Sequence, residues 1–301
     1  SSLRIVSTDW SQFRGPTGNG VVPAQGIALN WKSSPVLRWK IPAGEGHSSI
    51  ITYESSVITM EQDGQEELVI ARSLDDGKTL WEHAVRTRWD DFMSGVGPRS
   101  TPTIAGGKLY AVFTDGSLVC LEAGSGKLVW QTMIVSENHN FPEWGFSFSP
   151  LVWNNLVIVT PGGEDSAARA YRTDSGELAW SSDFHGEGVY LSPSVMNLLG
   201  REQLITAVSG KIAFLNPRTG KTSWTGPWKI FLNNAQIAQP LALANDSILL
   251  SAGYGKGSER WKVTSGSGKA YAVDSEWKSK NLKSKFSNPV LKNGYLYGFS
   301  E

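Results

Sequence analysis

Short runs of apolar residues, separated by turns that contain glycine, follow one another along most of the chain. The clearest example divides residues 101–134 into segments of strand length, TPTIAGG, KLYAVFTDG, SLVCLEAGSG and KLVWQTMI. The junction glycines Gly107, Gly116 and Gly126 reach positive φ without steric cost, which suits tight turns between antiparallel strands. The pattern predicts an all-β protein made of units with four short strands each.

A glycine followed four residues later by tryptophan marks one point in most units. The pairs are Gly77/Trp81, Gly126/Trp130, Gly176/Trp180 and Gly220/Trp224, and the series extends without the glycine to Trp39 and Trp277. Successive tryptophans are 42 to 53 residues apart, close to the period at which four-stranded propeller blades repeat. We predict each tryptophan on the outermost strand of its unit, where the ring packs against a glycine turn and the neighbouring unit.

A second marker runs in phase with the tryptophans. A proline precedes one apolar strand per unit, and Ile50 takes its place in the first copy; the pairs are Thr101-Pro102, Ser149-Pro150, Ser192-Pro193, Gln239-Pro240 and Asn288-Pro289. Proline removes a donor from the strand ladder and therefore belongs at the start of a strand. We predict that this strand is the innermost one, facing a central channel.

The two markers together predict a β-propeller of four-stranded antiparallel blades. The expected blades cover residues 48–86, 100–135, 148–184, 191–228 and 238–280, and a partial blade covers 288–301. Residues 1–47 form a lead-in in which Val36–Lys40 is expected to be a ring-closing outer strand. The partial blade favours an incomplete ring that lacks about two blades.

Composition excludes several other classes. The 301 residues hold 28 Lys plus Arg against 28 Asp plus Glu, so no net charge recruits nucleic acid or an anionic membrane. No apolar stretch approaches the ~18 residues of a membrane span. Cys120 is the only cysteine, which excludes an internal disulfide and a cysteine-rich zinc site. At the repeat position of Ala71, Ala170 and Phe214, it is expected to be a buried thiol, with a reactive nucleophile as the alternative.

The Gly-Lys-x-x-Trp turns resemble the pyrroloquinoline-quinone (PQQ) repeat, whose tryptophan-docking motif reads approximately Ala-x-Asp-x-x-Thr-Gly-Lys-x-x-Trp. The segments Asp9–Gly20, Ser251–Gly257 and Asn288–Phe299 also look like parts of bacterial exported PQQ-like propellers. The resemblance implies a ring of about eight blades. It also implies one of two activities: a quinoprotein alcohol dehydrogenase that binds PQQ and Ca²⁺, or a scaffold similar to BamB of the outer-membrane assembly machinery.

The chain departs from the dehydrogenases of that superfamily. Those enzymes carry a vicinal disulfide against the quinone, and a single cysteine cannot form one. No counterpart of their Glu and Asn calcium ligands or Asp base is recognisable, and the pairs Asp75-Asp76 and Asp90-Asp91 lack the alternating spacing of a calcium loop. We therefore predict no cofactor, no metal and no catalytic residue, with PQQ and calcium expected only under the quinoprotein alternative.

The loops from each outer strand to the next inner strand gather at one end of a propeller channel, the default binding surface. They cover residues 43–49, 86–100, 136–149, 184–192, 231–239 and 281–288. The channel-facing candidates are His47, Arg99, Trp144, Tyr190, Asn234 and Lys285. Trp144 and Tyr190 could sandwich a planar ligand while Arg99 and Lys285 pair with its carboxylates; the alternative is a wet channel lined by polar loops.

Histidines suggest one further possibility. His47, His139 and His185 fall in loops at the same end, so a three-histidine metal site is conceivable, whereas His83 is expected at the surface of an outer strand. The preferred interpretation remains an exported, periplasmic, non-enzymatic propeller that binds an envelope-associated protein or peptide. The alternatives are a PQQ-dependent oxidoreductase and a small-molecule sensor module.

Overall fold

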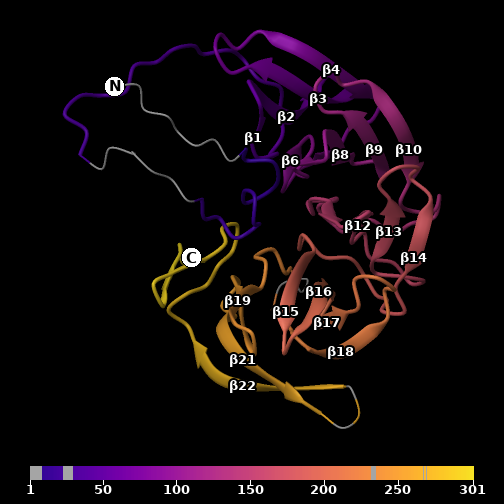
Figure 1. The fold of residues 1–301 in the computed structure, drawn as a ribbon, viewed down its shortest axis with the longest axis vertical. Helices are drawn as coiled ribbons and strands as arrows, with labels where there is room; N and C mark the ends of the chain where they lie inside the picture. The colour runs from indigo at the N-terminus through magenta and orange to yellow at the C-terminus, as the bar shows by residue number, and fades with distance from the viewer. Residues whose placement is uncertain (1–8, 23–29, 232–234, 267, 269) are drawn as a thin grey trace.

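The computed structural model describes residues 9–22, 30–231, 235–266, 268 and 270–301, and the regular structure within these ranges consists of β-strands. Five four-stranded antiparallel sheets follow one another along the chain, each in simple sequence order. Figure 1 shows them fanned around a common axis, with the last strand of each sheet on the outside of the arc. The predicted all-β propeller architecture is confirmed.

The strands are short, as the turn spacing predicted. The first sheet contains β1 (Ile51–Tyr53), β2 (Ser56–Asp63), β3 (Glu66–Ser73) and β4 (Thr79–Val85). The second contains β7 (Thr103–Ala105), β8 (Lys108–Val112), β9 (Ser117–Glu122) and β10 (Leu128–Met133). The third contains β11 (Leu151–Trp153), β12 (Leu156–Val159), β13 (Arg169–Arg172) and β14 (Leu178–Ser181). The fourth contains β15 (Ser194–Leu198), β16 (Arg201–Val208), β17 (Lys211–Leu215) and β18 (Thr222–Pro227), and the fifth contains β19 (Leu241–Ala244), β20 (Ser247–Ala252), β21 (Gly257–Ser265) and β22 (Tyr271–Ser279).

Two hairpins complete the described strands. β5 (Asp90–Asp91) pairs with β6 (Gly95–Val96) inside the loop between the first and second sheets, and β23 (Val290–Lys292) pairs with β24 (Tyr295–Tyr297) in the predicted partial blade. Each predicted blade range encloses one of these sheets. The described sheets form an arc that they do not close (Figure 1), and the number of eight blades stays a prediction.

Each indole of the series from Trp39 to Trp180 lies against the glycine turn of the following sheet. A Cβ added to that glycine would lie less than 3.0 Å from an indole carbon; the pairs are Trp39–Gly77, Trp81–Gly126, Trp130–Gly176 and Trp180–Gly220. Three of the ring N–H groups also donate to a carbonyl of the same turn, at Leu74 (3.0 Å), Thr173 (3.0 Å) and Pro217 (3.2 Å). The first four sheets are therefore linked by the same indole–glycine contact at their outer edges.

Trp224 and Trp277 make different contacts. Trp224 packs on Phe214 (centroids 4.7 Å apart) and edge-on against Trp261 (5.5 Å). β21 and β22 form a hairpin that extends beyond β18 in Figure 1, so no glycine turn meets the Trp224 ring as in the earlier sheets. Trp277 on β22 is 38% exposed. In all five sheets a bulge nevertheless lies beside the outer-strand tryptophan, so the strand positions are equivalent.

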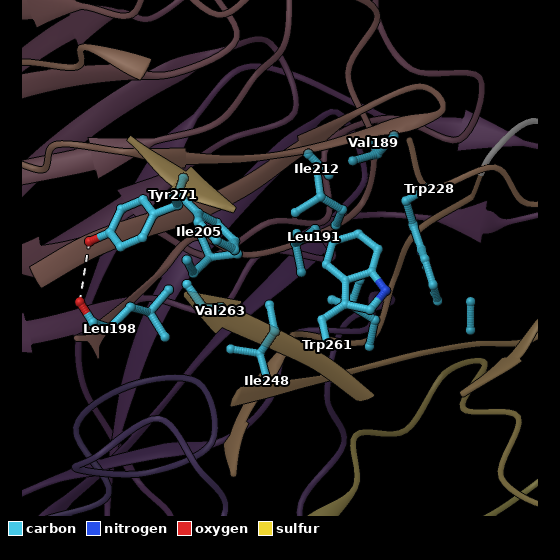
Figure 2. Close-up of a cluster of buried hydrophobic side chains, with 14 of the residues drawn as sticks. Val189, Leu191, Leu198, Ile205, Ile212, Trp228, Ile248, Trp261, Val263 and Tyr271 are labelled. Atoms are coloured by element: carbon cyan, nitrogen blue, oxygen red, sulfur yellow. Dashed lines mark hydrogen bonds between the residues drawn. The ribbon is translucent and has the colours of Figure 1, made fainter. Parts of the chain in front are cut away.

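The largest buried cluster fills the space between the fourth and fifth sheets (Figure 2). Ile205 and Ile212 of one sheet meet Ile248 and Trp261 of the next, all at 6% exposure or less. The Tyr271 hydroxyl donates to the Leu198 carbonyl oxygen at 3.2 Å across this boundary. Alternate residues of each middle strand face opposite neighbouring blades, so both faces of the strand are buried. One of these two sets of residues supplies this interface.

Residues 9–20 of the lead-in lie beside the inner strands, to which they hydrogen-bond. Trp10 exchanges hydrogen bonds with Thr52 of β1, and the Ile104 N–H of β7 donates to the Ser11 carbonyl (2.7 Å). The buried Arg14 guanidinium donates to the Pro289 carbonyl at 2.8 Å. Residues 9–20 therefore connect the first two sheets to the start of the partial blade, a contact that the sequence did not predict.

The role of Val36–Lys40 as a ring-closing outer strand stays a prediction, because the blade that it would complete is not among the described sheets. These residues pair with no strand within the described ranges, and Val36 and Leu37 are exposed. A strand requires a hydrogen-bonding neighbour, and no described segment lies beside this one in a ladder. Trp39 still packs on Gly77, so the indole contact forms without the strand.

Candidate functional site

Each long connection runs from an outer strand to the next inner strand, so these loops gather at one end of the channel, which we call the loop face. It comprises residues 43–49, 86–100, 136–149, 184–192, 231, 235–239 and 281–288. Several large apolar side chains of these loops or beside them are exposed: Phe92 (100%), Phe231 (95%), Met93 (76%), Phe286 (76%) and Ile50 (61%). These side chains are not among the candidates predicted from the sequence, because those candidates were chosen for their polar groups or for aromatic rings that could stack on a ligand.

A chain of hydrogen bonds links the sheets beneath these loops, through the residue two positions before the start of each inner strand. We call this chain of bonds the seam. In its direct links, a backbone N–H donates to a side-chain oxygen of the next sheet: Ser49 to Thr101 (3.0 Å), Thr101 to Ser149 (3.0 Å), Ser149 to Ser192 (2.9 Å) and Gln239 to Asn288 (2.6 Å). Gln239 Nε2 completes it by donating to the Ser192 carbonyl at 3.2 Å. Each of these residues carries a side-chain oxygen. This shared feature is visible in the sequence, but only the adjacent prolines were used there as the marker.

Arg99 stabilises its own loop. The guanidinium donates to the carbonyl oxygens of Ser94 (2.6 Å), Gly95 (2.8 Å) and Gly97 (3.1 Å) and to the Ser94 hydroxyl (2.9 Å). Burial lowers its pKa, while the nearby charges of Asp91 and Glu67 act in the opposite direction. With its donors directed at the β5–β6 hairpin, Arg99 is a structural clamp in this conformation, contrary to the proposed carboxylate pairing.

Trp144 and Tyr190 do come together, but directly on each other. Their ring centroids are 5.2 Å apart with an interplanar angle of 24°, and the Trp144 N–H donates to the Tyr190 hydroxyl (3.3 Å). Burial raises the pKa of Tyr190 to about 12. Rings in direct stacking leave no space for a third plane between them, so the expected sandwich is wrong in this conformation.

The remaining candidates are dispersed. Lys285 Nζ lies 4.5 Å from the Tyr254 ring centroid and 5.2 Å from that of Phe286, so its ammonium rests on aromatic faces. His47 is exposed, and its N–H donates to the Pro98 carbonyl at 2.8 Å. Asn234 lies outside the described residues. The five described candidates therefore lie in loops of one face without forming one pocket.

The histidines do not assemble a metal site. Within the described ranges, no group of three His, Cys, Asp or Glu side chains is close enough to hold a metal ion. His139 packs edge-on against Phe141 (5.2 Å), and burial lowers its pKa. His83 on β4 is half-buried, and its ring centroid lies 6.4 Å from that of Phe113. This corrects its expected surface position, because the loop side of the next sheet covers it.

Cys120 lies inside the second sheet, between Tyr110 of β8 and Trp130 of β10 in the ladder. Its side chain is fully buried, and burial raises its pKa to about 11. A thiol that stays protonated and inaccessible is a poor nucleophile. Within the described residues, the structure has no helix that is long and apolar enough to cross a membrane.

Glu67 is a buried acid that sequence analysis did not identify. It is 0% exposed on β3 and accepts hydrogen bonds from the Thr114 N–H (3.0 Å) and hydroxyl (2.6 Å) of the second sheet. Burial raises its pKa to about 7, partly offset by the bonds from Thr114 and by the charge of Arg99. The carboxyl group therefore links two blades close to the loop face.

Glu67 predicts a pH dependence of stability. Because its folded pKa of about 7 exceeds the ordinary value of 4.5, the folded chain keeps a proton that the unfolded chain releases between these values. Its contribution should thus fall as pH rises from about 4.5 to 7, by up to about 3 kcal/mol. Between pH 5 and pH 7.5, the free energy of unfolding measured with urea should fall less in Glu67→Gln than in the parent. The same substitution at the exposed neighbour Glu66 is the control, and equal losses in both variants would refute the assignment.

Comparisons with known proteins place this architecture in a family. A family model described as outer membrane protein assembly factor BamB matches residues 30–301. The outer membrane protein assembly factor BamB of Bordetella pertussis (strain Tohama I) is 24% identical over 48% of this chain and 45% of its own length. Quinohemoprotein alcohol dehydrogenase ADH IIB of Pseudomonas putida is 31% identical over 37% of this chain and 17% of its own length. The chain thus spans less than half the length of these curated relatives.

Solved structures share the fold at low sequence identity. Quinohemoprotein alcohol dehydrogenase from Comamonas testosteroni matches with a TM-score of 0.58 and 16% identity, covering 89% of this chain and 49% of that one. BamB from Moraxella catarrhalis matches with a TM-score of 0.52 and 17% identity, covering 86% of this chain and 82% of that one. Since the family model covers most of the chain and the repeated sheets have the same architecture, the chain belongs to the BamB family of PQQ-like β-propellers.

Proposed function

We propose that this chain is an exported, non-enzymatic scaffold that binds a protein or peptide partner of the cell envelope through its loop face. The observation that carries the proposal is the exposure of Phe92, Phe231 and Phe286 on loops of that one face. Exposed aromatic side chains that gather on one surface mark interaction sites, and buried aromatic anchors contribute most of the energy of protein interfaces.

The base beneath these side chains is pre-organised. The seam links the inner strands, and Arg99 fixes the loop that carries Phe92 through its bonds to Ser94 and Gly95. A loop already held in one conformation loses less entropy on binding, so more of the contact energy appears as affinity. The names of the BamB relatives, which refer to outer-membrane protein assembly, support an envelope-associated partner.

The quinoprotein alternative draws support from the dehydrogenase relatives, but the residues near the channel do not fit its cofactor. Trp144 and Tyr190 stack on each other, and Arg99 is engaged by carbonyl oxygens. Cys120 is buried away from any partner thiol. Among the described side chains, no cluster of acidic residues offers calcium the carboxylate oxygens that it prefers. We therefore favour the scaffold.

Site-specific photo-crosslinking tests the proposal. We expect a photoreactive phenylalanine analogue at Phe92, Phe231 or Phe286 to give the same discrete adduct in envelope extracts of the source cells. The analogue at Leu178, which is exposed (55%) on the outer strand β14, is the matched control and should not give it. Phe92→Ser should weaken binding of the identified partner by about 30-fold, as expected for an aromatic hot spot.

Two results would contradict the scaffold. One is an adduct pattern that does not differ between Phe92 and Leu178. The other is dye-linked alcohol oxidation after addition of PQQ and Ca²⁺ to a chain that gives no adduct at any of the three phenylalanine positions.

A further inference from the structure

A cavity of about 290 Å³ lies in the central channel, alongside the inner strands β11 and β15. Its walls combine the apolar side chains of Pro150, Leu151, Pro193 and Val195 with hydroxyl and amide groups. The size is close to the lower end of the range for small-molecule pockets, about 300–1,000 Å³. It is separate from the exposed phenylalanines of the loop face.

The lead-in forms the remaining wall. Gln12, Phe13, Thr17 and Gly18 line the cavity. This segment is held in place on both sides, because the Ile104 N–H donates to the Ser11 carbonyl and Arg14 donates to the carbonyl oxygens of Asn19 (3.0 Å) and Pro289 (2.8 Å). One wall of the cavity is therefore fixed backbone, which favours a pre-formed site.

Polar atoms in the wall remain without protein partners. Gln239 is 8% exposed; its N–H donates to Asn288 (2.6 Å) and its Nε2 to the Ser192 carbonyl (3.2 Å), which orients the amide. The Gln239 Oε1 atom and the Ser194 hydroxyl are buried and have no hydrogen-bond partner among the described residues. Because both residues line the cavity, a small side-chain rotation would bring these atoms into contact with a ligand that supplies a donor.

Charges of both signs lie at the end of the cavity formed by Trp153. Glu202 lines the cavity and accepts a hydrogen bond from Trp153 Nε1 at 3.2 Å. The Arg218 guanidinium lies 5.0 Å from the centroid of the same indole. The opposite charges give this end no preference for an ion of either sign, whereas the Glu202 carboxylate still accepts hydrogen bonds.

We propose that the cavity binds a neutral, polyhydroxylated molecule of monosaccharide size. Its hydroxyl groups donate to Gln239 Oε1 and to the Glu202 carboxylate and exchange a hydrogen bond with the Ser194 hydroxyl. Its C–H faces pack on Pro150 and Pro193. This chemistry satisfies the unpaired acceptor and uses the apolar walls together, which an inorganic ion or a purely apolar ligand would not do.

Calorimetric titration of the folded chain with free hexoses and pentoses tests the proposal. We expect at least one sugar to bind saturably with a Kd of about 1 mM or below, and Trp153 fluorescence to change on binding. Gln239→Met removes the acceptor together with the Nε2 donor to Ser192, while the backbone N–H to Asn288 remains, and should weaken binding about tenfold. Glu202→Gln, an exposed change that the fold should tolerate, should weaken it several-fold. Gln131→Met makes the same exchange on the exposed side of β10 and should leave affinity unchanged.

Absence of saturation by every sugar up to about 10 mM would overturn the proposal. So would a Kd that neither Gln239→Met nor Glu202→Gln changes, or tighter binding of small organic ammonium ions than of sugars. If Gln239→Met does not fold, as judged by its thermal transition, Glu202→Gln and Ser194→Val decide between these outcomes.

Discussion

Trp130→Ala should lower the free energy of unfolding by about 3–5 kcal/mol, the cost of removing a well-packed aromatic side chain. The Trp130 ring is 9% exposed and packs 5.9 Å from the Tyr110 ring. Its N–H donates to the Thr173 carbonyl in the next sheet, and Gly176 lies against its face. The substitution therefore opens a cavity at a blade boundary and removes the shorter of two hydrogen bonds to the Thr173 carbonyl, the other coming from the Tyr110 hydroxyl. Urea unfolding monitored by circular dichroism measures the loss.

Trp277→Ala is the matched control, because Trp277 occupies the equivalent position on the outer strand β22. This side chain is 38% exposed, and no glycine turn of another described sheet lies against it. We expect its truncation to cost about 1 kcal/mol or less. Equal losses for the two variants would show that the indoles stabilise single blades and do not link neighbouring ones.

Gly126→Ala should destabilise the chain by about 3 kcal/mol. Gly126 has φ of 68°, and a Cβ there would overlap the Trp81 ring. Left-handed backbone costs a side-chain-bearing residue about 1–2 kcal/mol, and forcing an extra methyl into a packed contact costs roughly 1–3 kcal/mol more. The thermal midpoint and the urea midpoint should fall together.

Gly124→Ala in the same turn provides the control. A Cβ at Gly124 meets nothing within 4 Å, and its φ is not in the left-handed region. We expect a change within about 0.5 kcal/mol. In a Trp81→Ala background, Gly126→Ala should cost less, since only the backbone strain remains. Unchanged cost in that background would show that the ring contact does not matter.

Local sequence was sufficient to predict the blades because each one is encoded within a continuous stretch. A glycine at positive φ and a tryptophan four residues later, as in Gly176 and Trp180, mark a turn and an outer strand wherever they occur. A proline such as Pro150 marks the start of an inner strand for an equally local reason, its missing N–H. Such signals need no knowledge of the rest of the fold.

The candidate site could be predicted only as a set of loops. Loop membership followed from the repeat, but side-chain direction in a loop depends on partners far away in the chain. Arg99 was expected to face the channel, and it instead donates to carbonyl oxygens of its own hairpin. Trp144 and Tyr190 were expected to flank a ligand, and they stack on each other.

The sequence by itself determined the all-β architecture, the repeat and the end of the channel at which the long loops gather. Only the tertiary structure decided that residues 9–20 lie beside the inner strands, that Glu67 joins two blades and that Gln239 leaves an acceptor unpaired in a cavity. The physical reason is the range of the interactions. Turn conformation and strand periodicity are set within a few residues, whereas burial and hydrogen-bond partners are set by segments that meet only when the sheets assemble around their axis.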